Sequence, residues 1–177
     1  MISRMLTASL FVALLSIAAN NEARAQGQVI VDSIMHDGIQ REHMLYVPSS
    51  YLPGNVRPLV VNMHGHGMTA ENQMNITGMN AVAEQQDYLV VYPTAPNNSW
   101  FGNEDHFGYM DALLQHVASG FDVDPYRVFA TGYSQGAFMS YVFAVLRPET
   151  FAAIAPVAGI RWFNYEGGTI PETPARK

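Results

Sequence analysis

Short apolar runs alternate with helix-like segments along most of this chain, and this alternation limits the fold more than any other feature. Each of the first three apolar runs is followed by a segment that predicts a helix, because its apolar residues have helical spacing or because it is apolar nearly all round. These helical segments are residues 76–86, 109–120 and 137–146. Strands that are apolar on both faces and joined by helices form a parallel sheet covered on both sides. The apolar runs that predict these strands are residues 59–63, 88–92, 127–131 and 152–157.

A hairpin is expected before the parallel strands. Residues 29–35 and 43–47 are rich in strand-forming residues and flank Asp37-Gly38, a pair that favours a tight turn. The length of 177 residues suits one domain, and an apolar content of 49% is enough for a packed core. We therefore predict one α/β domain over residues 26–177, with a mostly parallel sheet and an antiparallel hairpin at its N-terminal edge.

The composition argues against several classes of function. The sequence has no cysteine, which excludes disulfides, thiolate metal sites and a cysteine nucleophile in these residues. Its net charge is −6 and its nine basic residues are scattered, which argues against a nucleic-acid partner. We expect neither a cofactor nor a bound metal.

The first 25 residues have the pattern of an export signal. Arg4 supplies a positive charge, residues 5–19 are mostly apolar, and Ala23-Arg24-Ala25 fits a small-x-small cleavage site. The apolar run is shorter than the ~20 residues that a membrane span needs. The alternative is an uncleaved anchor helix. We predict a signal peptide over residues 1–25, cleavage before Gln26, a secreted or periplasmic protein, and no membrane span after removal of the signal.

The candidate chemistry lies at Gly132-Tyr133-Ser134-Gln135-Gly136, where an apolar strand runs directly into an apolar helix. Such a strand-to-helix turn holds its serine in a strained conformation with the hydroxyl exposed. The motif predicts Ser134 as a nucleophile and the backbone N–H of Gln135 as an oxyanion donor. The alternative is that the pattern is a chance occurrence in a glycine-rich loop.

A second glycine-rich segment, His64-Gly65-His66-Gly67, follows the first core strand. A loop at this place supplies the other oxyanion-hole donor in this type of fold, which makes the backbone N–H of His66 the candidate. One alternative is a metal site formed by His64 and His66, although no third ligand stands at a recognisable spacing. Another is that His64 is a structural, hydrogen-bonded histidine.

With these motifs in place, the chain resembles the secreted polyhydroxybutyrate depolymerase, feruloyl esterase and acetylxylan esterase group of α/β-hydrolases. The chain departs from the group at His66, where cysteine is frequent, and at Asp105-His106, where paired acids are common. The matching pieces are Tyr46-Val47-Pro48-Ser49, Pro58-Leu59-Val60-Val61 before His64-Gly65, Val90-Val91-Tyr92-Pro93, Asp124-Pro125-Tyr126-Arg127-Val128, Thr131–Gly136 and Phe151–Gly159.

The resemblance implies a serine carboxylic-ester hydrolase that forms an acyl-enzyme on Ser134 and acts on polymeric or plant-wall esters of hydroxyalkanoate, feruloyl or acetyl-xylan type. Trp100, in a polar loop after the second core strand, is a candidate substrate-binding residue, and Phe101 and Phe107 flank the same loop. The alternatives are a secreted serine peptidase of the prolyl-oligopeptidase type and a non-catalytic polymer-binding protein derived from a hydrolase.

The acid and the histidine of a catalytic triad are missing from the expected positions. In this fold they follow the serine in the order Ser, Asp or Glu, His. After Ser134 the sequence has no histidine and only three acids, Glu149, Glu166 and Glu172. We therefore expect a domain that is incomplete at its C-terminus, with very low turnover in the given chain. The alternative is a base from upstream: His36, His43, His106 or His116.

Overall fold

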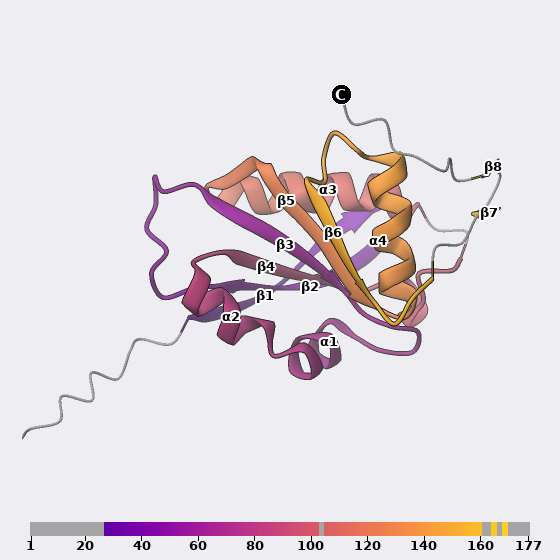
Figure 1. Cartoon of the computed structure of the whole chain (residues 1–177), viewed down its shortest axis with the longest axis horizontal. Helices are drawn as coiled ribbons and strands as arrows, with labels where there is room; N and C mark the ends of the chain where they lie inside the picture. Colours follow the sequence, from indigo (N-terminus) through magenta and orange to yellow (C-terminus); the bar gives the residue numbers. More distant parts are fainter. Residues whose placement is uncertain (1–26, 103–104, 161–163, 166–167, 170–177) are drawn as a thin grey trace, which may run out of the picture.

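A computed structural model of the chain describes residues 27–102, 105–160, 164–165 and 168–169. Its main element is a six-stranded twisted sheet with the order β1-β2-β4-β3-β5-β6 (Figure 1). The pairs β3/β4, β3/β5 and β5/β6 are parallel. The strands are β1 Gln28–His36, β2 Ile39–Val47, β3 Arg57–Met63, β4 Leu89–Pro93, β5 Val123–Tyr133 and β6 Ala153–Val157.

The predicted hairpin is confirmed. Strands β1 and β2 pair antiparallel along their whole length, and β2 continues antiparallel onto β4. Asp37 and Gly38 both have positive φ, 47° and 75°, as a two-residue hairpin turn of the primed type requires. The prediction of a mostly parallel sheet with an antiparallel N-terminal edge is therefore correct.

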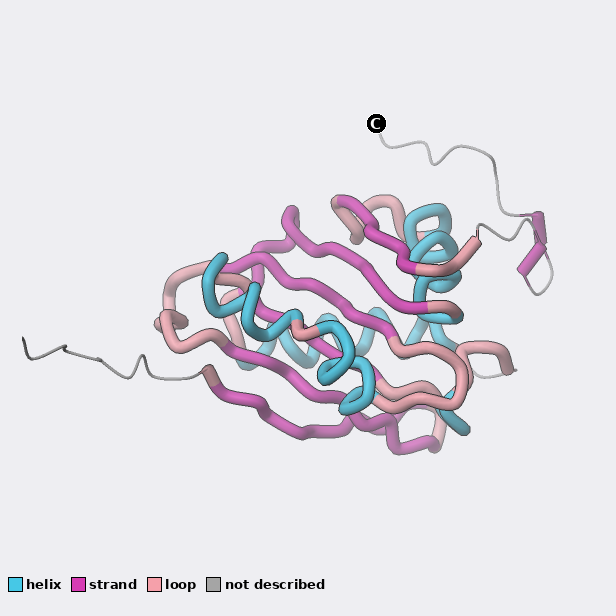
Figure 2. The backbone as a smooth tube through the Cα atoms, turned by 60° about the horizontal axis from the view of Figure 1, so that its bottom comes forward, coloured by secondary structure: helices cyan, strands magenta, loops and turns pink. Residues whose placement is uncertain are grey.

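Helices cover both faces of the sheet. Figure 2 shows two short helices, α1 and α2, lying across the near face, with the longer helices behind the sheet. Helices α3 and α4 pack on that far face, where they bury the larger apolar cluster, which includes Leu45, Val61 and Phe143. A smaller cluster around Tyr92 and Ala83 lies under α1 and α2. The helices are α1 Ala70–Thr77, α2 Met79–Gln86, α3 His106–Gly120 and α4 Gln135–Leu146.

Two local predictions were wrong. The helix predicted over residues 76–86 is divided into α1 and α2 at Gly78, whose positive φ of 57° ends the first helix. The first helix also begins earlier, because Thr69 and Asn72 form a reciprocal capping box. Of the turn predicted over residues 122–125, residues 123–125 belong instead to β5, since Val123 pairs with Arg57 of β3.

The remaining short elements lie in loops. A 3₁₀ turn, η1 (Pro96–Asn98), interrupts the long loop after β4. Strands β7 (Asn164–Tyr165) and β8 (Gly168–Thr169) form a two-residue antiparallel pair. The predicted signal peptide, residues 1–25, and two of the downstream acids, Glu166 and Glu172, lie outside the described residues.

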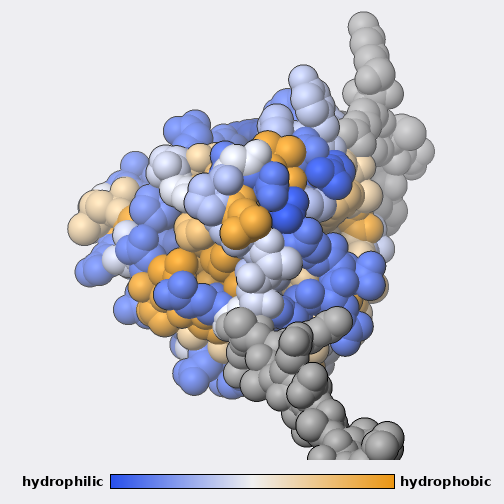
Figure 3. Space-filling model, turned by 90° about the vertical axis from the view of Figure 1, so that its left-hand side faces the viewer, coloured by the Kyte–Doolittle hydropathy of each residue, from blue (hydrophilic) through white to orange (hydrophobic). Residues whose placement is uncertain are grey.

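Figure 3 views the molecule from the side opposite the carboxyl ends of the parallel strands, and there hydrophobic residues form separate small groups between hydrophilic ones. In the described part of the chain, every helix is too short or too polar to cross a bilayer.

Candidate active site

Ser134 lies at the abrupt turn between β5 and α4. Its backbone has φ 53° and ψ −111°, a conformation that residues other than glycine rarely adopt. Its N–H donates to the carbonyl of Val157 at 3.0 Å, which ties the turn to the end of β6. The side chain is half-buried and makes no capping bond to α4. Within the described residues, the hydroxyl is therefore held at the turn above the sheet and is not used to cap α4.

The two glycines of the motif are required by close backbone packing. A Cβ added to Gly132 would lie 2.6 Å from the carbonyl oxygen of Met63 and 2.5 Å from the carbonyl carbon of Gly136. A Cβ on Gly136 would meet the backbone of Met63 and the carbonyl oxygen of His64. All of these atoms are backbone atoms, which cannot rotate away. The glycines let the end of β3 and the start of α4 meet directly beside Ser134.

The serine opens onto an apolar pocket of about 210 Å³. This pocket lies where the loops after β5 and β6 meet the start of α4. Its wall contains two aromatic rings, Phe101 and Phe138, that meet edge to face with centroids 5.1 Å apart. A site of this kind suits the apolar part of a small ligand placed against the serine. The described lining residues are Phe101, Ser134, Gln135, Phe138, Ala158, Gly159 and Ile160.

Gln135 is the first residue of α4 and lies in the pocket wall. The first N–H groups of a helix have no partner within the helix, and the helix dipole makes this end positive. The N–H of Gln135 is therefore available to negative charge that develops beside Ser134. Its side-chain carbonyl accepts from the backbone N–H of Trp100 at 3.0 Å, so the residue also fixes the loop that carries Phe101.

His64 has a structural role. The side chain is fully buried, its Nδ1 donates to the carbonyl of Gly65 at 2.7 Å, and its Nε2 accepts from the N–H of Ala95 at 2.9 Å. Burial lowers the pKa of His64, which agrees with the neutral form that these two bonds need. With both nitrogens occupied, His64 is not available as a metal ligand. The interpretation of His64 as a hydrogen-bonded structural histidine fits this geometry.

His66 lies in the loop after β3, where its side chain is exposed. A Cβ on the preceding residue, Gly65, would lie 3.0 Å from the ring of Tyr133, so this loop packs beside the Ser134 turn. His66 is not among the described residues that line the pocket. Its backbone N–H as an oxyanion donor therefore stays a prediction.

The structure does not place Trp100, predicted to bind substrate, among the described residues that line the pocket. Its ring is fully buried, and its Nε1–H donates to the carbonyl of His64 at 2.9 Å. The residue anchors the loop after β4 to the end of β3. The neighbouring Phe101, 42% exposed, is the aromatic residue of this loop that lines the pocket. Phe138 could have been found from the sequence, because it stands one helical turn after Ser134.

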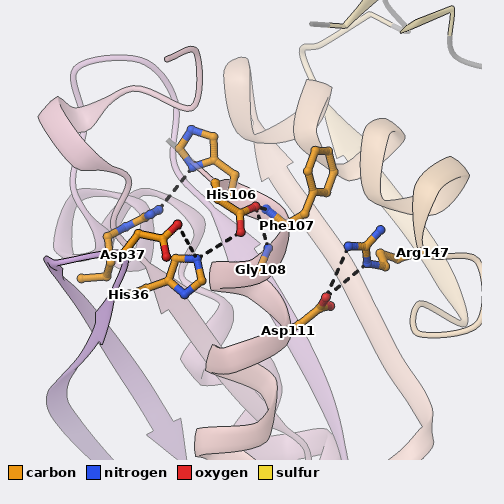
Figure 4. Close-up of polar contacts among 9 residues, drawn as sticks. His36, Asp37, His106, Phe107, Gly108, Asp111 and Arg147 are labelled. Atoms are coloured by element: carbon orange, nitrogen blue, oxygen red, sulfur yellow. Dashed lines mark hydrogen bonds and ion pairs between the residues drawn. The ribbon is translucent and has the colours of Figure 1, made fainter. Parts of the chain in front are cut away.

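A polar network, buried at Arg41 and His106 and open to solvent at Asp105, supports the same loop (Figure 4). Asp105 caps α3 by accepting from the N–H groups of Phe107 and Gly108, and His36 bonds its other oxygen at 3.2 Å. Arg41, 2% exposed, donates to Nδ1 of His106 at 3.3 Å and stacks 3.7 Å above the ring centroid of Tyr109. The start of α3, and with it the end of the loop that carries Phe101, is thereby fixed to the hairpin.

None of the four upstream histidines proposed as an alternative base lines the serine pocket in the described part of the chain. His36 bonds Asp105, and His106 accepts from Arg41. His116 bonds Asp32 at 2.8 Å, and His43 packs edge-on against His116. Glu149, the one acid after Ser134 that lies within the described residues, is exposed and is not among the residues that line this pocket.

Parts of this chain are similar in sequence to known proteins. No family model matches the chain. A poly(3-hydroxyalkanoate) depolymerase of Paucimonas lemoignei is 38% identical over 127 residues, covering 64% of this chain and 30% of that protein. Feruloyl esterase C of Emericella nidulans is 30% identical over 138 residues, covering 74% of this chain and 51% of that protein. The matched part of the chain thus spans 30% of the length of the first relative and about half of the second.

The fold of the chain is also similar to that of solved structures. A fluorophosphonate-binding serine hydrolase of Staphylococcus aureus superposes with a TM-score of 0.66 at 18% identity, covering 77% of this chain and 62% of that one. At this identity the match shows the fold alone, which is the α/β-hydrolase fold expected from the sequence. Over part of its length the chain is therefore similar in sequence to members of the depolymerase and feruloyl esterase group.

Proposed function

We propose, from the α/β-hydrolase fold of this chain and its partial-length similarity to depolymerases and feruloyl esterases, that the protein is a serine carboxylic-ester hydrolase with Ser134 as its nucleophile. The observation that carries the proposal is the positive φ of Ser134 at a half-buried position in the wall of an apolar pocket. A strained, non-glycine residue at such a place is typical of a functional site.

The reaction follows from this geometry. The Oγ atom of Ser134 bonds to the ester carbonyl carbon as a base removes its proton, and the carbonyl electron pair moves onto oxygen. The backbone N–H groups of Gln135 and His66 stabilise that oxyanion, each contributing about 3 kcal/mol to barrier lowering. Collapse breaks the bond to the alcohol, which leaves with a proton. Water then attacks the acyl-enzyme by the same steps and releases the acid.

The described pocket provides the nucleophile but no base. A serine hydroxyl is a weak nucleophile unless a base accepts its proton, and no histidine stands among the described lining residues. Serine sites without their base keep about 10³–10⁴-fold catalysis over water, through the oxyanion hole and binding. We therefore expect slow acylation of Ser134 in the 177-residue chain, which an added base should accelerate.

For substrates, we propose esters whose acyl group has an apolar part, because the pocket wall beside Ser134 is formed by Phe101 and Phe138. Polymeric hydroxyalkanoates and feruloyl or acetyl groups on plant-wall polysaccharides fit the similarity to the depolymerase and the feruloyl esterase. We also propose export with cleavage before Gln26, which N-terminal sequencing of the protein recovered outside the cytoplasm would test.

Chemical rescue tests the proposed activity. Imidazole added at increasing concentration supplies the missing base, and p-nitrophenyl acetate reports acyl transfer. The expected result is a rate that rises with neutral imidazole and exceeds that of Ser134→Ala by roughly tenfold or more, since general-base catalysis contributes about 10²–10⁴. Ser119→Ala, which changes an exposed serine at the end of α3, is the control and should behave as the unmodified chain.

Two results would contradict the proposal. Equal rates for the unmodified chain and Ser134→Ala at every imidazole concentration would favour a non-catalytic polymer-binding protein. Rescue confined to a peptide p-nitroanilide, with no rescue on the ester, would instead favour the serine peptidase.

A further inference from the structure

Three potential metal ligands converge between the hairpin and α3, outside the serine pocket. Asp32 comes from β1, His43 from β2 and His116 from α3. One ligand atom from each lies within 4.8 Å of the other two. The Nε2 of His116 is 2.8 Å from Oδ2 of Asp32, and the rings of His43 and His116 meet nearly at right angles with centroids 5.4 Å apart.

Rigid elements hold these side chains in place. Asp32 and His43 are direct cross-strand partners in the β1/β2 register, so both point to the face of the sheet that α3 covers. His43 is also paired with Pro93 of β4, which fixes its strand from both sides. The backbone N–H of Ser33 donates to Oδ1 of Asp32 at 2.7 Å, which orients the carboxylate with Oδ2 toward His116. Orientation of this kind is what neighbouring groups supply in metal sites.

His43 provides the second observation. The residue is 2% exposed, and its Nδ1 lacks a hydrogen-bond partner of good geometry among the described residues, although the backbone of Arg41 interacts with the ring. A buried polar atom without a partner costs about 1–3 kcal/mol, so an imidazole is seldom buried in this way without a reason. Coordination of a cation by the ring is one such reason.

The ligand set fits a divalent transition metal. Two imidazoles and one carboxylate bind Zn²⁺ at about 2.0–2.2 Å, which places neighbouring tetrahedral ligand atoms roughly 3.3 Å apart. The observed pair at 2.8 Å and the remaining separations of up to 4.8 Å approach this through small side-chain rotations. The side chains of His116 and Asp32 are 38% and 48% exposed, which leaves the outer side open to water.

We propose that Asp32, His43 and His116 form a binding site for a divalent transition-metal ion such as Zn²⁺. The ion would join the hairpin to α3 and so stabilise the face of the sheet that carries the loop network described above. The proposal departs from our sequence-based expectation of no metal, and it is independent of the activity of Ser134.

A second cluster, His36, Asp37 and Asp105, is a weaker candidate (Figure 4). It has a single histidine, which already lies 3.2 Å from Asp105 and 3.6 Å from Asp37. One oxygen of Asp105 is also occupied in capping α3. This cluster supplies the matched control for the first one, because it lies on the same hairpin and helix.

The test is titration calorimetry of the chelator-treated, untagged chain with ZnCl₂. The expected result is saturable binding of one ion, with affinity at least tenfold lower in His116→Ala and in Asp32→Asn, and unchanged in His36→Ala. Asp32→Asn keeps the size of an exposed side chain, so it reports on coordination even where His116→Ala alters packing. Thermal unfolding gives a second readout, in which saturating Zn²⁺ raises the Tm by roughly 5 °C in the unmodified chain.

Any of three results would overturn the proposal. The first is an absence of saturable heat in the unmodified chain. The second is binding of Zn²⁺ by both His116→Ala and Asp32→Asn with an affinity within twofold of that of the unmodified chain. The third result is loss of Zn²⁺ binding in His36→Ala alone. The last result would assign the ion to the second cluster.

Discussion

Replacing Ser134 by glycine should stabilise the fold relative to replacing it by alanine. Both variants remove the hydroxyl, so they differ only in the backbone that position 134 prefers. The conformation at φ 53° and ψ −111° costs a non-glycine residue about 1–3 kcal/mol. Glycine avoids that cost but loses about 0.5–1 kcal/mol more backbone entropy on folding. The net expectation is that Ser134→Gly is about 1 kcal/mol more stable than Ser134→Ala.

The assay is urea unfolding followed by far-UV circular dichroism, with the free energy of unfolding extrapolated to water. Ser140 is the control, because it lies inside α4 in helical backbone and its hydroxyl bonds the carbonyl of Gly136. There glycine should be less stable than alanine by about 1 kcal/mol, the opposite sign. If Ser134→Gly is no more stable than Ser134→Ala, position 134 is not strained and our reasoning about the turn fails.

Three further predictions concern the supports of the site. Gly132→Ala should lower stability by about 2–3 kcal/mol, through overlap with the backbone of β3 and α4, whereas Gly120→Ala, with open space around its Cβ, should be neutral or slightly stabilising in the same urea assay. Trp100→Phe should cost about 2 kcal/mol, because it leaves the buried carbonyl of His64 without its donor; an unchanged midpoint would contradict the anchoring role. The N–H of Gly108, with a smaller contribution from His36, lowers the pKa of Asp105 below its ordinary 3.8, so the charge of Asp105 stabilises the fold fully above about pH 4 and progressively less as the pH falls through the folded-state pKa. Asp105→Asn should therefore be about 0.5 kcal/mol less stable near pH 6, and this difference should shrink as the pH falls through the folded-state pKa of Asp105, as measured by thermal unfolding over a range of pH.

The Ser134 turn could be predicted from the sequence because its requirements are local. The strand, the two glycines and the apolar helix follow one another along the chain, although the close contacts of the glycines with Met63 and His64 involve a strand that is distant in sequence. The hairpin at Asp37-Gly38 was predictable for the same reason, since two consecutive residues of positive φ form the whole turn.

Features that depend on contacts between distant segments could not be predicted. Trp100 and Phe101 are adjacent and both aromatic, and the sequence does not say which of them enters the core. The choice depends on the carbonyl of His64, 36 residues earlier. Likewise, the cluster of Asp32, His43 and His116 depends on the strand register and on the packing of α3, with 84 residues between Asp32 and His116.

Reaction with a fluorophosphonate, followed by peptide mass spectrometry, tests most directly whether Ser134 is a nucleophile in a preformed oxyanion site. We expect a single adduct, on Ser134, that forms at least about a hundredfold faster than any adduct on exposed serines such as Ser119 and is absent from Ser134→Ala. An unlabelled Ser134, or label spread evenly over exposed serines, would show that Ser134 is not a nucleophile in such a site.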